Sequence, residues 1–278
     1  MSKRLSIWLK LSLLILGFLS FASPSFADIV GFDNSQWTVN SGSSTTPASV
    51  GSGTAILTWS EQGDGQSIYY NQQQAVGNGF TVSFTYTASN FGGDFGGLPA
   101  DGFTFVIQGG ALTALGGSGS DLGYAGIQNS ASVQFNLWQF NGGGIGTGYF
   151  TNGDVAPSVN ALYTPTTPVN LASANPIAIT LVYDAVLHTL TESLQDTATT
   201  DTFSHVFTGV DIGQAVGGNL AYVGFTGGTG GNFATQVLGD LSFTSTAATV
   251  PEPSSVTLVG LGGMGLVVNA LRRRRAAI

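Results

Sequence analysis

Hydrophobic and polar residues alternate with a period of two along most of residues 28–249. The alternation is clearest in residues 82–87, 103–108 and 177–184, where apolar side chains take every second position. Such a period places successive side chains on opposite faces of a strand, whereas a helix needs a period near ~3.6. Further strands are expected near residues 37–40, 55–59, 67–70, 148–154, 187–194, 203–207, 221–225 and 237–243. The pattern predicts a body built almost wholly of short β-strands.

Glycine, asparagine and serine separate these segments, as turn residues do between antiparallel strands. Long loops are expected at residues 41–52 and 88–99, and strands resume after each. A short helix is expected from Ile212 to Val216, with Asp211 as its N-cap. No linker divides the body, so we predict one all-β domain over residues 28–249, an antiparallel sandwich or barrel.

The N-terminal end differs from this body. Residues 1–10 carry three cations, residues 11–21 are apolar, and Ser25-Phe26-Ala27 places small residues at the two positions that a signal peptidase reads. This order is typical of a secretory signal peptide, so residues 1–27 are predicted to be removed by cleavage after Ala27.

Residues 250–278 contain three elements in a fixed order. Pro251, Glu252 and Pro253 end the β-rich body, residues 254–271 are apolar and uncharged, and residues 272–275 are all Arg. As a helix, the apolar segment would span about 26 Å, slightly less than the ~30 Å hydrocarbon core of a membrane. A simple tail anchor, with the arginines on the cytoplasmic side, is one interpretation.

This order also resembles a PEP-CTERM sorting signal. The resemblance implies a bacterial protein that is exported, inserted transiently in the inner membrane through residues 254–271, and processed by an exosortase-type enzyme near Pro253. It further implies a final place at the cell surface or outside the cell, in bacteria that produce exopolysaccharide and form biofilms.

The charges are distributed unevenly along the chain. All seven Lys and Arg lie within residues 3–10 and 272–275, and all fifteen Asp and Glu lie between Asp28 and Glu252. The body therefore cannot neutralise phosphates, which argues against a nucleic-acid partner and phosphate cofactors. Its negative field attracts cations, Ca²⁺ among them. The chain has no Cys, so it forms no disulfide and offers no thiolate metal ligand.

Three stretches of the body carry a second resemblance. Residues 100–106 read Ala-Asp-Gly-Phe-Thr-Phe-Val, residues 133–136 read Val-Gln-Phe-Asn, and residues 221–227 read Ala-Tyr-Val-Gly-Phe-Thr-Gly. In this order they resemble strands of the legume-type lectins. The resemblance implies a concanavalin A-like jelly-roll sandwich, with a flat back sheet, a curved front sheet and a ligand in the loops beside the front sheet.

The same resemblance implies the residues of a carbohydrate-binding site. Asp101 stands at the family's sugar-binding aspartate, and the peptide bond before it is commonly cis in the family. Gly116 and Gly117 stand where a backbone N–H meets the sugar, and Asn141 stands near the amide that binds both sugar and Ca²⁺. A carboxylate suits this role because its charge-assisted hydrogen bonds to hydroxyl groups are strong.

The family's metal positions are changed in this chain. Gln134 and Asn136 replace the Glu-x-Asp pair, and Thr147 stands where a His ligand is expected. Two amides supply no negative charge to offset a cation. We therefore predict no transition-metal site and no other bound cofactor. A Ca²⁺ site stays open, because amide oxygens can bind this ion, but it would lack its charged ligands.

Laminarinase-like glycoside hydrolases share this sandwich, but retaining hydrolysis needs two carboxyl groups about 5–5.5 Å apart. Glu61 and Glu192 are isolated in the sequence, so enzymatic activity is not expected. Both histidines, His188 and His205, are expected on strand faces, although a Ser–His–Asp arrangement that uses Asp184 stays open.

Exposed aromatic rings would complete a sugar site, because they stack on sugar rings. The candidates are Trp59, Tyr69, Tyr70, Trp138 and Tyr149. The leading hypothesis is an exported, non-enzymatic lectin-like protein that binds glycan or exopolysaccharide. The alternatives are a structural or adhesive surface protein with the same fold and no sugar site, and a glycoside hydrolase.

Overall fold

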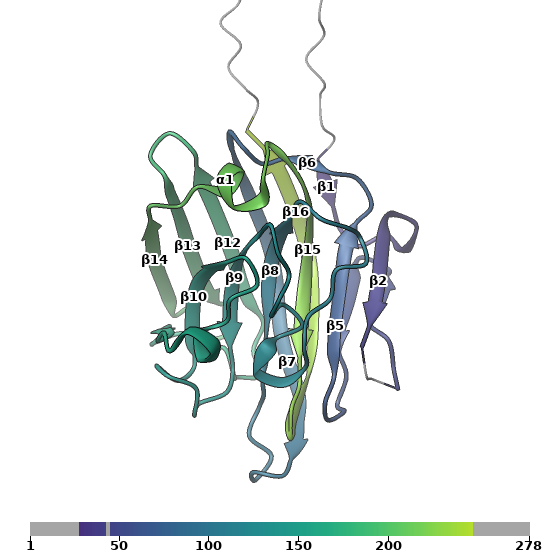
Figure 1. Ribbon diagram of the computed structural model, residues 1–278. Helices are drawn as coiled ribbons and strands as arrows, with labels where there is room; N and C mark the ends of the chain where they lie inside the picture. The colour runs from purple at the N-terminus through teal and green to yellow at the C-terminus, as the bar shows by residue number, and fades with distance from the viewer. Residues whose placement is uncertain (1–27, 43–44, 247–278) are drawn as a thin grey trace, which may run out of the picture.

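The computed structural model describes residues 28–42 and 45–246, which form two β-sheets packed face to face (Figure 1). Every strand pairing in this part of the chain is antiparallel, so the predicted all-β antiparallel sandwich is confirmed. Within these residues no helix is long and apolar enough to cross a membrane. The predicted signal peptide and C-terminal hydrophobic helix lie outside the described residues.

The two sheets have eight strands each. The back sheet runs in the order β14 (Thr202–Thr208), β13 (Thr189–Asp196), β12 (Ile177–Asp184), β7 (Gly79–Gly93), β16 (Asn232–Ser245), β4 (Thr54–Thr58) and β3 (Ser49–Gly51), with β1 (Ile29–Val30) paired to β16. The front sheet runs in the order β11 (Thr164–Pro165), β10 (Gly146–Thr151), β9 (Ser130–Asn136), β8 (Gly102–Gln108), β15 (Leu220–Gly228), β5 (Gly65–Tyr70) and β2 (Trp37–Ser41), with β6 (Gln74–Ala75) paired to β15. The helical elements are η1 (Asn34–Gln36), η2 (Gly119–Asp121), η3 (Ala156–Val159) and α1 (Ile212–Val216).

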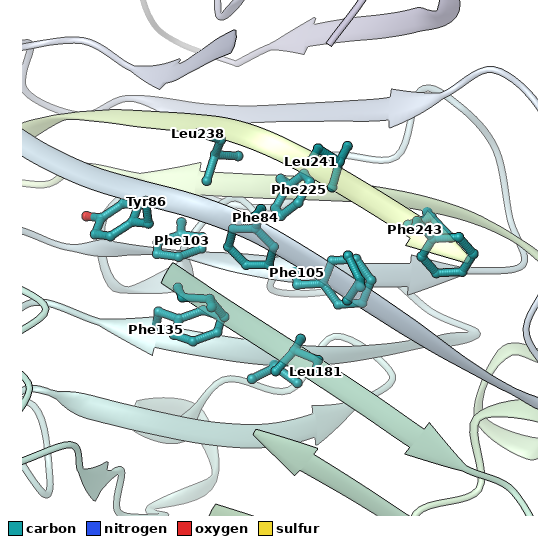
Figure 2. Packing of buried hydrophobic residues seen from close by; sticks show 14 of the residues in the cluster. Phe84, Tyr86, Phe103, Phe105, Phe135, Leu181, Phe225, Leu238, Leu241 and Phe243 are labelled. Carbon is teal, nitrogen blue, oxygen red and sulfur yellow. The ribbon is translucent and has the colours of Figure 1, made fainter. Parts of the chain in front are cut away.

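Aromatic side chains from the inward-facing positions of both sheets form the centre of the core (Figure 2). The Phe103 ring of β8 lies 4.3 Å from the Tyr86 ring of β7 and 4.6 Å from the Phe135 ring of β9, measured between centroids. The Phe84 and Phe225 rings lie 5.0 Å apart across the two sheets. Burial of each ring stabilises the fold by roughly 1.5–3 kcal/mol, and each favourable ring pair adds about 0.5–1.5 kcal/mol. The alternating pattern therefore encodes the core directly.

Three predicted loops needed correction, and the first of them, at residues 41–52, contains β3. β7 continues to Gly93, so part of the loop predicted at residues 88–99 is strand. β13 begins at Thr189 rather than at residue 187, because the hairpin before it is wider than the sequence suggested. The Asp184 Oδ1 atom accepts backbone N–H groups of that turn and stabilises it.

The predicted short helix is confirmed as α1. The Asp211 side chain accepts a hydrogen bond from the Gln214 N–H at 2.9 Å, which is the expected N-cap contact. Gly217 ends the helix with a left-handed backbone conformation, at a φ of 78°.

A second, smaller cluster lies on the outer face of the front sheet, beneath the loop of residues 109–129. Tyr69 from β5 packs there with Tyr124 from the loop. Tyr69 is fully buried and Tyr70 is 6 % exposed, so the prediction that these two rings are available to a sugar is wrong. The loop covers Tyr69, and Tyr70 packs against Trp37 in the main core. Sequence alternation cannot reveal this second layer, because the covering loop has no regular period.

Candidate functional site

Asp101 directly precedes β8, and the peptide bond between Ala100 and Asp101 is cis, as the resemblance implied. The Asp101 N–H donates to the Gly228 carbonyl oxygen at 3.0 Å, and its own carbonyl oxygen accepts the Leu137 N–H at 2.8 Å. These bonds tie Asp101 to the ends of β15 and β9. The residue therefore lies at the end of the sandwich opposite α1 (Figure 1).

The Asp101 side chain is 7 % exposed, and its Oδ2 atom accepts no hydrogen bond from the described residues. Burial raises the pKa of this carboxyl to about 7. Repulsion from the Asp121 carboxylate adds to this rise in pKa, and the nearby Gly230 N–H opposes it. The Gly230 N–H itself donates to the Asn232 carbonyl oxygen at 3.0 Å. The carboxyl group thus has an open acceptor position in a largely dry environment.

The glycine-rich loop that begins at residue 115 lies against Asp101. The Gly119 N–H donates to the Thr229 carbonyl oxygen at 2.9 Å, which fastens the loop to the turn after β15. A Cβ atom on Gly119 would lie 3.8 Å from Asp101 Oδ2. This loop is therefore one wall beside the Asp101 carboxyl group.

Gly116 and Gly117 differ in what their N–H groups do. The Gly116 N–H donates to the Gly123 carbonyl oxygen at 2.7 Å, so it is used within the loop. The Gly117 N–H donates to no partner in the part of the chain that the structure describes. Gly117 also packs so closely on the Asp121 carboxylate that a Cβ atom would overlap Oδ2. Gly117 thus offers a free donor, in the loop that flanks Asp101.

Asn141 lies in the hairpin between β9 and β10, where its side chain bonds a neighbouring amide. Its Nδ2 atom donates to Asn136 Oδ1 at 2.7 Å. The Asn136 Nδ2 atom in turn donates to the carbonyl oxygens of Trp138, at 2.9 Å, and Gly144, at 2.7 Å. No hydrogen bond joins Asn141 to Asp101 within the described residues. The structure therefore brings Asp101 and the Gly117 loop together and uses Asn141 to close its own hairpin.

The residues at the family's metal positions do not fit an ion. Gln134 and Asn136 are fully buried. Gln134 Oε1 accepts the Tyr163 hydroxyl at 3.0 Å, and its Nε2 atom donates to the Asp154 carbonyl oxygen at 2.8 Å. The side-chain amides of Gln134 and Asn136 are therefore hydrogen-bonded to other protein groups. Among residues 28–42 and 45–246, no group of three or more His, Cys, Asp and Glu is placed to hold a metal ion.

The glutamates Glu61 and Glu192 are bonded to different parts of the fold. Glu192 of β13 is buried between the sheets, where its Oε1 atom lies 3.0 Å from the Thr147 hydroxyl oxygen of β10. Burial raises the pKa of Glu192 to about 8. Glu61 accepts the hydroxyl groups of Thr45, at 2.8 Å, and Thr46. The arrangement offers no paired carboxylates from these two residues.

The prediction that both histidines lie on strand faces is right for His205 and wrong for His188. His205 lies in β14 with its ring between Phe203 and Phe207. His188 lies in the turn before β13 at a φ of 52°, and its Nδ1 atom is 3.2 Å from the Val210 carbonyl oxygen. Because Asp184 accepts turn N–H groups, it does not pair with His188 as a triad would require.

Three aromatic rings gather in the loops at the Asp101 end. The Trp138 ring centroid lies 5.8 Å from that of Phe95 and 5.0 Å from that of Phe140. Phe95 is 61 % exposed and Phe140 is 67 % exposed. Trp138 was predictable as a candidate from the sequence, whereas Phe95 and Phe140 were not, because loop residues follow no alternation. Their signal was the presence of large apolar residues among glycine, asparagine and aspartate.

The other predicted aromatic candidates have structural contacts. Trp59 donates its Nε1–H to the Pro47 carbonyl oxygen at 2.9 Å. Tyr149 is half-buried and packs against the main core, with its ring 6.1 Å from that of Phe207. Of the five candidate rings, Trp138 is the one that joins the aromatic group beside Asp101.

Solved structures of plant lectins share this fold. The chain is similar to peanut lectin in a complex with a peptide (21 % identity, TM-score 0.65, covering 82 % of this chain and 99 % of that chain). It is similar to lectin I-B4 from Griffonia simplicifolia in its metal-free form (17 % identity, TM-score 0.64, covering 80 % and 100 %). It is also similar to the lectin from Bauhinia forficata in complex with GalNAc (19 % identity, TM-score 0.61, covering 80 % and 99 %). These likenesses confirm the legume-lectin fold.

The C-terminal segment matches a family model described as the PEP-CTERM protein-sorting motif, over residues 249–275. The match includes Pro251, Glu252 and Pro253 and confirms the resemblance seen in the sequence. The motif implies export to the cell surface or the extracellular space. The chain therefore combines a lectin-like sandwich with a protein-sorting motif for export.

Proposed function

We propose that the protein is an exported, non-enzymatic lectin-like protein that binds glycan or exopolysaccharide through Asp101 and the Gly117 loop. The observation that supports this most is the pair of open polar groups at one end of the sandwich. Asp101 Oδ2 is a buried acceptor without a partner, and the Gly117 N–H is a donor without one within the described chain. Buried polar groups are rarely left unpaired. Sugar hydroxyl groups, which both donate and accept, would satisfy the two together.

We propose further that this binding needs no metal ion. The hydrogen bonds among Asn141, Asn136 and the Gly144 carbonyl oxygen close the hairpin that borders the site. Neutral amides supply no negative charge to offset an ion. Binding should therefore survive treatment with a chelator such as EDTA, and a loss of binding that added Ca²⁺ restores would contradict this.

A glycan array with the full chain tests the proposal, in the presence and absence of Ca²⁺. Asp101→Ala should abolish binding, because it removes the acceptor. The matched control is Asp240→Asn, which removes one charge from an exposed position bonded to Thr85 in the back sheet. If Asp101→Ala binds as well as the original chain, the site is elsewhere. If a broad array shows no binding at all, the structural or adhesive alternative takes its place.

The lack of enzymatic activity belongs to the same proposal. Glu61 and Glu192 are bonded to separate parts of the fold, which supports a binding role over hydrolysis. Release of reducing sugars from β-glucans by the purified chain would overturn this part and favour a glycoside hydrolase.

We also propose a route for the exported chain. Residues 1–27 are removed as a signal peptide, residues 254–271 insert transiently in the inner membrane, and an exosortase-type enzyme cleaves near Pro253. The domain of residues 28–249 then remains at the cell surface or in a biofilm matrix. Mass spectrometry of the protein from producing cells would refute the cleavage if the mature form still ended at Ile278.

A further inference from the structure

Three carboxylates lie near the candidate site on three separate segments, and one of them, Asp94, accepts a hydrogen bond from Gln62 Nε2 at 3.1 Å. Asp94 lies in the loop after β7, Asp101 precedes β8, and Asp121 lies in η2. A Cβ atom on Gly230 would lie 2.9 Å from Asp101 Oδ2, and one on the next residue, Gly231, would lie 3.1 Å from Asp94 Oδ2. The two adjacent glycines therefore place the Asp94 and Asp101 carboxylates on either side of a single turn.

No basic side chain in the body balances these carboxylates. Residues 28–271 contain no Lys or Arg. His205 is enclosed by two phenylalanine rings of β14, and His188 lies in a turn at the opposite end of β12 and β13. Asp101 is buried with an unpaired Oδ2 atom, and a buried charge without a partner is costly. A cation that meets Asp101 must therefore come from a ligand.

A compact metal ion does not suit this arrangement. Ca²⁺ needs several oxygen ligands that converge at about 2.3–2.6 Å. The three carboxylates come from separate loops, and the described residues hold no acidic group that converges in this way. Three carboxylates on separate segments, one of them the buried Asp101 carboxyl group, instead match a ligand that carries several spaced positive charges.

The aromatic group of Phe95, Trp138 and Phe140 adds the second half of such a surface. Phe95 follows Asp94 directly, and its N–H donates to the Asn232 side chain at 2.9 Å, next to the glycine turn. Trp138 follows Leu137, whose N–H bonds the Asp101 carbonyl oxygen. Aromatic rings stack on the apolar faces of sugars and attract ammonium groups through cation–π interactions. The backbone therefore connects Phe95 to Asp94 and holds the segment of Trp138 beside Asp101.

We propose that this end of the sandwich selects a cationic glycan, a chain of amino sugars whose amino groups are at least partly free. The inference rests on the proposed glycan binding and specifies its ligand. Ammonium groups would pair with the Asp94, Asp101 and Asp121 carboxylates, while sugar rings lie on the aromatic group. Acidic polysaccharides would be repelled by a body that carries only negative charge.

Titration calorimetry of the full chain with matched oligosaccharides tests this inference. The probes are the β-1,4-linked hexamer of glucosamine, with free amino groups, and the same hexamer of N-acetylglucosamine. We expect the glucosamine hexamer to bind about tenfold more tightly, because hydrogen bonds between charged groups are stronger than neutral ones. The preference should shrink when salt is raised from about 0.05 M to about 0.5 M, because salt screens charge pairs.

Two single substitutions, one at the site and one distant from it, distinguish recognition by the site from an effect of the overall charge. Asp121→Asn should reduce the preference for the amino form, whereas the control Asp240→Asn should leave the preference unchanged. Equal affinity for both hexamers would overturn the inference and leave glycan binding standing. Equal losses in the two variants would show a general charge effect and also overturn it. If neither hexamer binds and the glycan array also shows no binding, the proposed function itself is wrong.

Discussion

Thr147 has one hydroxyl proton but two oxygen atoms at 3.0 Å, the Gln134 carbonyl oxygen and Glu192 Oε1. A hydroxyl group donates only once. Both contacts are hydrogen bonds when Glu192 is protonated and donates to Thr147, while Thr147 donates to Gln134. The pKa of Glu192, raised to about 8 by burial, agrees with this reading. At the residue scale, a neutral buried acid links the two sheets.

Stability should fall as the pH rises through the range in which Glu192 loses its proton. Its folded pKa of about 8 lies above the ordinary value of 4.5, so the folded state binds more protons between these values. The free energy of unfolding then decreases by up to about 1.4 kcal/mol per pH unit for one such group. Asp101, with its pKa raised to about 7, acts in the same direction. Urea denaturation at several pH values measures the slope.

Glu192→Gln isolates the contribution of Glu192. Glutamine can still donate to Thr147 but does not titrate, so the variant should match the original chain near pH ~5 and exceed its stability near pH ~8. Asp201→Asn, in the exposed turn after β13, is the matched control and should leave the profile unchanged. Identical pH slopes for Glu192→Gln and the original chain would rule out a protonated Glu192.

At the scale of elements, the β9–β10 hairpin is closed by amides. Asn136 is fully buried and donates to two carbonyl oxygens, while its own oxygen accepts from Asn141. An amide can make all three contacts at once, whereas an ionised carboxylate cannot donate. The amide at this position, where the lectin resemblance implies a carboxylate, therefore stabilises the hairpin.

Asn136→Asp should destabilise the fold. The carboxylate would face the carbonyl oxygens of Trp138 and Gly144 with no proton to donate, so we expect a loss of at least about 2 kcal/mol at neutral pH. Added Ca²⁺ should not restore it, because Gln134 beside it supplies no charge. Asn152→Asp, at an exposed turn position with a φ of 54°, is the control for the same change of charge. Rescue of the Asn136 variant by Ca²⁺ would show that a metal site persists, contrary to our proposal.

At the scale of the whole molecule, the body carries negative charge without Lys or Arg to offset it. Self-repulsion destabilises such a domain, and salt screens it. The melting temperature of the full chain should therefore rise when NaCl increases from about 0.05 M to about 0.5 M. Sucrose at matched osmolality controls for general solute effects. A melting temperature that responds equally to sucrose and NaCl would show that repulsion is not the cause.

Most of the fold could be predicted, because the alternating pattern of a strand depends only on residues that are close together in the sequence. The alternation at residues 82–86 and 103–107 marked the very rings that form the core, and Asp211 marked the start of α1. The site could be predicted only in part. Asp101 and its cis peptide bond followed from the resemblance, whereas Phe95 and Phe140 gave no periodic signal and Tyr69 was misplaced. Loop residues follow no period, so local pattern cannot assign their exposure.

The sequence by itself determined the alternation of strands, the all-negative body and the sorting signal, since each depends on residues close together in the chain. Only the tertiary structure decided which carboxyl groups are buried and which loops meet. Glu192 reads as an ordinary strand residue until β10 places Thr147 opposite it. Asp94, Asp101 and Asp121 come near one another only when the segments after β7, before β8 and in η2 meet at the turn after β15. Burial and shared electrostatics arise from contacts between distant segments, and those exist only in the folded chain.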